Sequence, residues 1–311
     1  MNKKTITFLV ALVVCIPMFS QTLLATAMVT QLVAQQPAAP GDAVFTLNKE
    51  DGHFYSETTL NGVPARVLLE SGVPGFMMSV AFYETNKDAL QLDVKESDEK
   101  IRYLGGIHQI KYTAQGRLRI GDAIFEGPIK IADGEHKLMM PIHMLRHSSD
   151  NSAIVRLDLP QLELKVCGRD QLQTLVTGAT ALDVTYNKWH MPVVHTLLSM
   201  DVNDRNASLE GDFIVDMGNA SLLFLNHANA SVTDMLKTKK IKLKEARDNR
   251  GKVVAKGIYA DNLTICDRTY KAVSVGVAEM KSLPECGFLG LKFFTMPTVF
   301  DFDNNKMYLC K

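Results

Sequence analysis

Alternation of apolar and polar residues dominates the chain from about residue 45 onward, and this pattern predicts β-strands. The segments GRLRIGDAIFEGPIKIAD (116–133) and AIVRLDLPQLELKVC (153–167) alternate with period two and carry turn residues between their apolar runs. HFYSETTLNGVPARVLLE (53–70) holds two such runs around Asn61-Gly62, a dipeptide that suits a tight hairpin because both residues tolerate positive φ. Helical periodicity is scarce, so we expect an all-β protein.

The strand pattern starts again in the second half of the chain. In each half an apolar strand ends in an acid, one further residue and a glycine: Glu70, Ser71 and Gly72, then Asp216, Met217 and Gly218. A strand-rich block begins at Leu118, 48 positions after residue 70, and a similar one begins at Leu263, 47 positions after residue 216. Cys167 follows residue 70 by 97 positions, and Cys310 follows residue 216 by 94. Three landmarks in the same order at near-equal spacing indicate an internal duplication, and hence two similar β lobes.

The repeat and the flanking composition predict five segments. Residues 34–43 (AQQPAAPGDA) have no apolar period, which is typical of a tether. The expected boundaries are a signal peptide at 1–27, a tether at 28–44, an N-terminal β lobe at 45–168, an interlobe connection at 169–185 and a C-terminal β lobe at 186–311.

The N-terminus predicts export. Lys3 and Lys4 precede the apolar run FLVALVVCIPMF, and small residues follow it. An uncleaved membrane anchor is the first alternative, but the apolar run before Pro17 is shorter than the roughly 20 residues that a spanning helix needs. The second alternative is a lipid anchor at Cys15, where Val14 occupies a place that favours a small residue. We therefore expect a periplasmic, secreted or surface protein.

Composition and charge argue only against partners that are bound mainly through charge. The chain has 311 residues, 46% hydrophobic and 22% charged, which is ordinary for a folded globular protein. Lys plus Arg and Asp plus Glu number 34 each, so the charge balance gives no case for nucleic acid or a stable membrane partner. The basic run KTKKIKLK (237–244) is interpreted as a solvated face.

Two β lobes that each present an acid and a glycine at the end of a strand resemble the aspartic peptidases of the pepsin and retropepsin type. CGFLGLKFF (286–294) is similar to the apolar-apolar-Gly element of that family, with Phe288, Leu289 and Gly290. The ending TVFDFDNNKMYLC is similar to its final interlobe strands. The resemblance implies a bilobal pepsin-like fold with a peptide-sized cleft, in an exported, bacterial-type member whose catalytic pair is altered.

The chemistry of that family requires two carboxyls about 3 Å apart, of which one stays protonated while the other polarises a shared water. The resemblance assigns these catalytic roles to Glu70 and Asp216. Glu70 stands where the family has Asp and adds a methylene of roughly 1.5 Å, in a kind of site that tolerates about 0.5 Å. Met217 stands where the family has a hydroxyl residue, and PIHMLR (141–146), at the place of the first-lobe apolar-apolar-Gly element, has no glycine.

Three functions remain open for these acids. The first is peptide-bond hydrolysis by Glu70 and Asp216, weakened by the altered motifs. The second is a pseudopeptidase that binds peptide or unfolded protein without cutting it. In the third, both acids cap turns of a structural β protein, since a carboxylate before glycine is common in turns. Each version is expected to be monomeric and to need no cofactor.

The resemblance also implies a flap and a disulfide framework. A first-lobe hairpin over residues 103–116 is expected to close over the substrate, with Tyr103 or Tyr112 as its aromatic contact, although either is equally an ordinary strand tyrosine. An even number of cysteines after signal removal favours disulfides. Cys167 with Cys310 is expected from the position of the equivalent strands in the family, which leaves Cys266 with Cys286.

Other chemistry is disfavoured by spacing. His143 and His147 lie four residues apart, but Met144 stands where a metallopeptidase helix would have Glu, so no metal site is expected. No serine lies in a Gly-x-Ser-x-Gly elbow. A glycosidase could use two carboxylates, but it would not explain the duplicated strand-acid-glycine frame.

Overall fold

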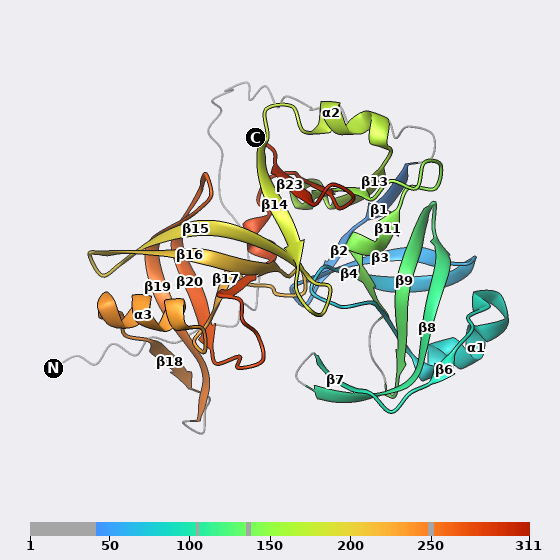
Figure 1. Ribbon diagram of the computed structural model, residues 1–311, viewed down its shortest axis with the longest axis horizontal. Coiled ribbons are helices and arrows are strands. Elements are labelled where there is room, and N and C mark those ends of the chain that lie inside the picture. Colours follow the sequence, from blue (N-terminus) through green and yellow to red (C-terminus); the bar gives the residue numbers. More distant parts are fainter. Residues whose placement is uncertain (1–41, 104–105, 135–137, 248–251) are drawn as a thin grey trace, which may run out of the picture. The chain divides into compact units, whose positions relative to one another are not determined.

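Figure 1 shows the computed structural model, which describes residues 42–103, 106–134, 138–247 and 252–311. The expected signal peptide, Cys15 and nearly all of the expected tether lie outside these residues. The first strand, β1 (Ala43–Thr46), begins two residues before the expected start of the N-terminal lobe. Within the described ranges, no helix is long and apolar enough to cross a membrane.

The first half of the chain forms a ten-stranded sheet in the described residues. Its strands are β2 (Asn48–Glu50), β3 (His53–Leu60), β4 (Val63–Glu70), β5 (Phe76–Ser79), β6 (Lys95–Glu96), β7 (Lys100–Tyr103), β8 (Gly106–Ile120), β9 (Ala123–Ala132), β10 (Leu138–Pro141) and β11 (Leu145–Arg146). The turn at Asn61-Gly62, where both residues have positive φ, joins β3 to β4 and confirms the predicted hairpin.

The other described strands form a thirteen-stranded sheet, which includes β1, β12 (Ile154–Asp158) and β13 (Glu163–Cys167) from the expected N-terminal lobe. Its remaining strands are β14 (Thr180–Tyr186), β15 (Pro192–Val202), β16 (Arg205–Val215), β17 (Leu223–Asn226), β18 (Lys244–Arg247), β19 (Val253–Ile265), β20 (Arg268–Ala278), β21 (Gly287–Leu289), β22 (Thr298–Asp301) and β23 (Lys306–Leu309). The run β1-β13-β12-β22-β23-β14 combines the first described strand with three strands from the middle of the chain and the last two, and β12 pairs with β22 at its centre.

The two halves repeat one topology, which supports the predicted duplication. β4 pairs in parallel with β10, as β16 does with β21. β5 pairs in parallel with β9 and antiparallel with β10, as β17 does with β20 and β21. The hairpin β8–β9, green in Figure 1, corresponds to β19–β20. Glu70 therefore ends the strand that is equivalent to the one before Asp216.

The sequence pattern missed the helices of the described residues, which are short. They are α1 (Val80–Leu90), α2 (Leu172–Leu175), α3 (Ala230–Thr238) and the 3₁₀ turns η1 (Ile142–Met144), η2 (Leu159–Gln161), η3 (Arg169–Gln171) and η4 (Leu291–Phe293). Ser79 caps α1 by accepting a hydrogen bond from the Phe82 N–H, and Asn229 caps α3 in the same way through the Val232 N–H. Only Tyr83 and Leu90 of α1 are buried, so its apolar stripe is too narrow to produce a strong helical period.

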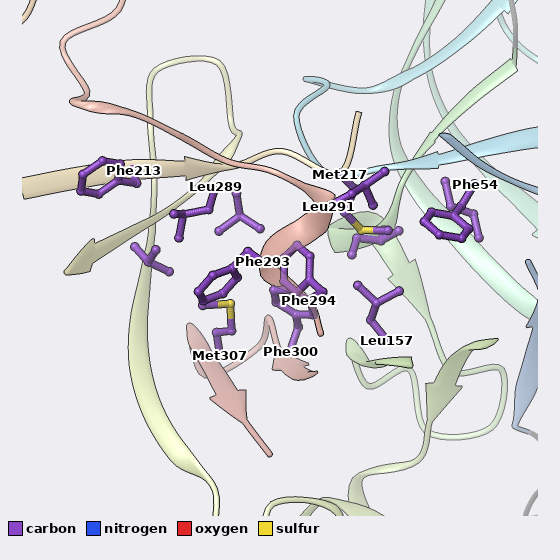
Figure 2. Close-up of a cluster of buried hydrophobic side chains, with 14 of the residues drawn as sticks. Phe54, Leu157, Phe213, Met217, Leu289, Leu291, Phe293, Phe294, Phe300 and Met307 are labelled. Atoms are coloured by element: carbon purple, nitrogen blue, oxygen red, sulfur yellow. The ribbon is translucent and has the colours of Figure 1, made fainter. Parts of the chain in front are cut away.

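One apolar core runs through the two halves and the strands that join them. Figure 2 shows its central part, where aromatic rings from the C-terminal segment pack together. Phe293 and Phe294 meet edge to face, with ring centroids 5.3 Å apart, and the rings of Phe300 and Phe302 stack at 5.2 Å. This core fixes the ends of β4 and β16 relative to each other.

The four described cysteines are free thiols, so the predicted disulfides are wrong. Cys167 and Cys310 do stand at the ends of equivalent strands, β13 and β23, but β12 and β22 lie between these strands. Three interstrand spacings amount to about 14 Å, whereas the Cα atoms of a disulfide lie within about 7 Å of each other. Equivalent positions in the repeat are therefore not adjacent positions in the sheet.

The second predicted bridge fails for a similar reason. The Sγ atom of Cys266, just after β19, lies 3.1 Å from the Thr196 Oγ1 on β15. Cys286 lies on the other side of the β15–β16 pair, with its sulfur over Gly211 of β16. Two strands thus separate the backbones of Cys266 and Cys286.

We expect the four thiols to be recovered as thiols. Burial raises the pKa of Cys167 to about 12, so alkylation of the native protein should be slow there. Iodoacetamide added in denaturant without reductant should modify Cys167, Cys266, Cys286 and Cys310, as read by peptide mass spectrometry. A peptide that joins two of these cysteines would contradict the structure.

Candidate active site

Strand alternation places both acids on the same side of their sheets. Along β4, Val67 and Leu69 face the main core, while Leu68 belongs to a separate apolar cluster. Glu70 follows Leu68 by two positions and therefore emerges on the face of that cluster. In the second half, Ile214 precedes Asp216 by two positions and also belongs to a separate cluster.

The two carboxyls are bound by equivalent backbone groups. The Gly72 N–H donates to Glu70 Oε1 at 2.8 Å, and the Gly218 N–H donates to Asp216 Oδ1 at 3.0 Å. Each bond runs from the second residue after the acid. Glu70 Oε1 thus has a backbone donor equivalent to that of Asp216 Oδ1, although the Glu70 side chain is longer by one methylene.

The additional length of Glu70 is used to reach the other half of the protein. The Gly218 N–H also donates to Glu70 Oε1 at 2.9 Å, so one backbone donor serves both acids. The two carboxyls therefore lie next to each other, and each shifts the pKa of the other. Glu70 is only 4% exposed, whereas Asp216 is half-buried. The structure therefore brings the two predicted catalytic residues into one carboxyl pair.

Burial makes it unfavourable for both members of the pair to be charged. Desolvation raises the pKa of Glu70 well above its usual range, and the charge on Asp216 raises it further, against the Gly72 and Gly218 N–H groups. Desolvation also raises the pKa of Asp216, but hydrogen bonds from Glu70, Gly218 and Asn219 oppose it. Asp216 is consequently the first to ionise, and Glu70 keeps the remaining proton.

Glycines are required beside the pair because of close approach and not because of unusual φ. Neither Gly72 nor Gly218 has positive φ, which corrects the usual expectation for a glycine in a turn. A Cβ atom on Gly72 would lie 2.7 Å from Asp216 Oδ1, and one on Gly218 would overlap Glu70 Oε2. Each glycine makes room for the acid of the other half.

Besides the Gly218 bond to Glu70, a single hydroxyl joins the two acid loops. Ser71 Oγ donates to the Val215 carbonyl at 2.7 Å and accepts from the Met217 N–H at 3.0 Å. Met217 has no hydroxyl to return these bonds. Its side chain is 1% exposed and belongs to the main core, where Figure 2 labels it together with Leu291 and Phe54. Ser71 is therefore the one hydroxyl residue between an acid and its glycine, and the bonds that a hydroxyl at position 217 would add are missing.

The apolar-apolar-Gly element lies beside Asp216 as the sequence suggested. Phe288 and Leu289 form part of β21, and the Leu289 carbonyl accepts from the Asp216 N–H at 2.9 Å. A Cβ atom on Gly290 would overlap the carbonyls of Asn219 and Ser221. In the first half β10 takes this place, and Pro141 pairs with Glu70 where a glycine would be expected.

The flap candidates both lie on the hairpin β7–β8. Tyr103 ends β7, and its side chain lies outside the described residues. Tyr112 of β8 contacts Tyr83 of α1, with ring centroids 5.8 Å apart, and packs against the main core. Tyr112 thus packs as a strand residue against α1, and its role as the aromatic contact of a flap stays a prediction.

Sequence reasoning missed His53. Its backbone neighbour Gly52 lies against Ala220 of the loop that carries Asp216, and a positive charge on the His53 imidazole lowers the pKa of Asp216. The available signal was the hairpin around Asn61-Gly62, because counting outward from this turn brings His53 level with Glu70.

The remaining histidine candidates do not form a metal centre. His143 is buried beside the rings of Tyr186 and Phe302, and His147 contacts Asp150 at 3.0 Å. These histidines are not on one helix, since η1 ends at residue 144. In the described part of the chain, no group of three or more His, Cys, Asp or Glu residues is arranged to hold a metal ion.

Comparison with known proteins identifies the fold. The chain is similar to the crystal structure of an aspartic proteinase from Irpex lacteus, with a TM-score of 0.54 and 11% sequence identity. The match covers 87% of this chain and 97% of that one. No family model and no curated protein matches the sequence. The protein therefore has a pepsin-like, all-β aspartic proteinase fold.

Removal of the Ser71 hydroxyl should destabilise the fold. The variant Ser71→Ala leaves the Val215 carbonyl and the Met217 N–H buried without a partner, which should cost roughly 2–4 kcal/mol of unfolding free energy. Urea denaturation measures this loss, with Ser208→Ala on the exposed side of β16 as the matched control. A loss no larger than that of the control would contradict the role given to Ser71.

The variant Glu70→Gln should change how stability depends on pH. A carboxyl whose pKa is raised on folding stabilises the folded state below its unfolded pKa of about 4.3, and this contribution is lost as the pH rises through the folded pKa. A glutamine keeps the acceptor oxygen and does not ionise, so its contribution to the unfolding free energy does not fall as the pH rises. We expect Glu70→Gln to gain unfolding free energy relative to the native protein as the pH rises from 4 to 8.

Urea denaturation at a series of pH values measures this difference. The exposed Glu126→Gln on β9 is the control, and it should follow the native protein throughout. A Glu70→Gln protein that is no more stable than the native protein at pH 8 would show that Glu70 does not hold the proton.

Proposed function

We propose that this protein hydrolyses peptide bonds with Glu70 and Asp216, more weakly than a pair of aspartates would. The observation that carries the proposal is the buried carboxyl pair, in which Gly218 donates one N–H to both acids and one proton remains on the pair. The likeness to an aspartic proteinase, at a TM-score of 0.54, supports the choice of reaction.

The order of ionisation assigns the roles. Ionised Asp216 is the general base, which takes a proton from the attacking water, and protonated Glu70 donates its proton to the carbonyl oxygen of the peptide bond. The water oxygen forms a bond to the carbonyl carbon. When the carbon–nitrogen bond breaks, the leaving nitrogen takes up the proton that Asp216 took from the water. The hydroxyl formed from the carbonyl oxygen returns its proton to Glu70.

Apolar clusters on both sides of the pair favour extended peptides with apolar side chains. The first contains Leu68 and Met77, with Ile101 partly exposed. The second contains Ile214, with Trp189 and Phe288 partly exposed. An extended substrate chain that lies across the pair would place alternate side chains against these clusters. Unfolded protein is thus the expected substrate class, bound by an exported monomer.

Binding without cleavage is the second candidate, and one observation favours it. Glu70 Oε2 lies over Gly218, on the far side of the pair from its own strand. An oxygen in this position competes for the space between the acids, where the attacking water would be bound. In this case the protein would capture peptide and release it intact.

Cleavage assays should separate these functions. The mature protein is incubated with a reduced, alkylated protein substrate at pH 3 to 7, and products are read by mass spectrometry. We expect cleavage at apolar sites, and a loss of about 10²–10⁴-fold in the isosteric variants Asp216→Asn and Glu70→Gln. Cleavage that both variants retain would exclude this carboxyl pair as the catalyst.

Peptide binding and the variant Glu70→Asp complete the test. The shorter side chain should withdraw from Gly218 and increase cleavage. A native protein that binds peptide but cuts nothing at any pH, combined with a Glu70→Asp variant that cuts, would establish the binding function. An absence of both binding and cleavage would leave only the structural role.

A further inference from the structure

His53 stands across from Glu70 in the hairpin that carries the acid. The pairs Tyr55↔Leu68 and Ser56↔Val67 fix the register of β3 against β4, and two further steps bring His53 level with Glu70. Alternation also puts His53 on the face of Tyr55, which is the face of the carboxyl pair, because Phe54 lies in the main core. His53 and Glu70 are the end residues of their strands.

The turn before His53 contacts the loop that carries Asp216. Gly52 has a φ of +80°, and a Cβ atom on it would lie 3.1 Å from the Ala220 Cβ. This contact holds the start of β3 against residues 216–220 of the other half. The Nδ1 atom of His53 is buried there, although the residue as a whole is partly exposed.

The repeat offers a comparison within the same molecule. In β15–β16 the pair Val193↔Ile214 corresponds to Tyr55↔Leu68, so the register brings Met191 level with Asp216. Met191 is buried in the apolar cluster of that half. Only the first half therefore places an ionisable side chain across from its acid.

The charges around His53 come from β2, the turn that follows it, β4 and the loop that carries Asp216. Glu50 of β2 pairs with His53 in the sheet and forms an ion pair with Arg66 of β4. Asp51 lies in the exposed turn between β2 and β3. The carboxyl pair supplies the negative charge on the buried side. Arg66 offsets part of the charge of Glu50, and Asp216 is the acid of the buried pair whose pKa a positive His53 lowers.

We propose that His53 is a third ionisable member of the carboxyl pair, and that its protonated imidazole holds the negative charge of the pair on Asp216 while Glu70 carries the proton. His53 is a positioning residue, since it acts through Asp216. The effect of His53 on the pKa of Asp216 agrees with this assignment. The proposal rests on the proposed hydrolysis only for its kinetic readout. Below about pH 6.5 an imidazole is mostly protonated, which is the range in which such a pair would work.

The kinetic test uses the pH profile of kcat/KM for peptide cleavage. In His53→Gln the acid limb of the profile should move to higher pH, because Asp216 loses the charge that favours its ionisation. His53→Arg should restore the limb, which a merely structural role of the imidazole would not achieve. The exposed His227→Gln is the matched control and should leave the profile unchanged. Equal profiles for His53→Gln and the native protein would overturn the proposal.

A second test does not depend on activity. Ring-nitrogen NMR of protein labelled with ¹⁵N-histidine follows the titration of His53 in the native protein and in Asp216→Asn. Coupling between two titrating groups is reciprocal, so His53 should lose its proton at lower pH in the variant. An unchanged His53 titration would overturn the inference even if the protein cleaves peptides. A shifted titration in a protein that cleaves nothing would uphold the inference and remove the proposed function.

Discussion

Two carboxyl groups that are buried side by side cannot both be charged, and the centre of this protein is built around that constraint. Removing an ionised carboxylate from water without compensation costs several kcal/mol. Here one acid stays protonated, and the other is stabilised by hydrogen bonds from the Gly218 and Asn219 N–H groups. Each half of the chain supplies one acid, so the constraint arises only when both halves are folded and joined. Ser71, with its two bonds to the other loop, makes this joint rigid.

The duplicated frame allows each side-chain change to be judged against its counterpart. The frame is nearly symmetric, since β4–β10 and β16–β21 repeat the same parallel pairing. The chemistry on it is not symmetric. Glu70 corresponds to Asp216, Ser71 to Met217, and His53 to Met191. The first half therefore carries the polar apparatus, while the second half contributes one acid and apolar packing. Such a division suits a pair in which one acid must hold the proton and the other the charge.

Much of the fold could be predicted from the sequence, because strand alternation and the repeat are local or linear signals. Alternation predicted the strands, and the common spacing from residues 70 and 216 predicted that both acids end equivalent strands. The disulfides could not be predicted, because linear equivalence of Cys167 and Cys310 says nothing about the two strands between them. The reason for a glycine at position 72 could not be predicted either. A larger residue there would collide with the Asp216 side chain, which lies 144 residues away in the sequence, and no local pattern reveals this contact.

The longer acid depends on the glycine of the opposite loop. Glu70 keeps the hydrogen bond from the Gly72 N–H that an aspartate would accept. Its additional methylene therefore moves the carboxyl toward the opposite loop. The space it uses lies over Gly218, where any Cβ atom would overlap Glu70 Oε2. The same approach gives Glu70 a second donor, the Gly218 N–H, which stabilises its inner oxygen. An alanine at position 218 would therefore displace Glu70 and disturb Asp216 together. This fold accepts a glutamate at position 70 only because position 218 of the other half is a glycine, which has no side chain in the space that Glu70 Oε2 occupies.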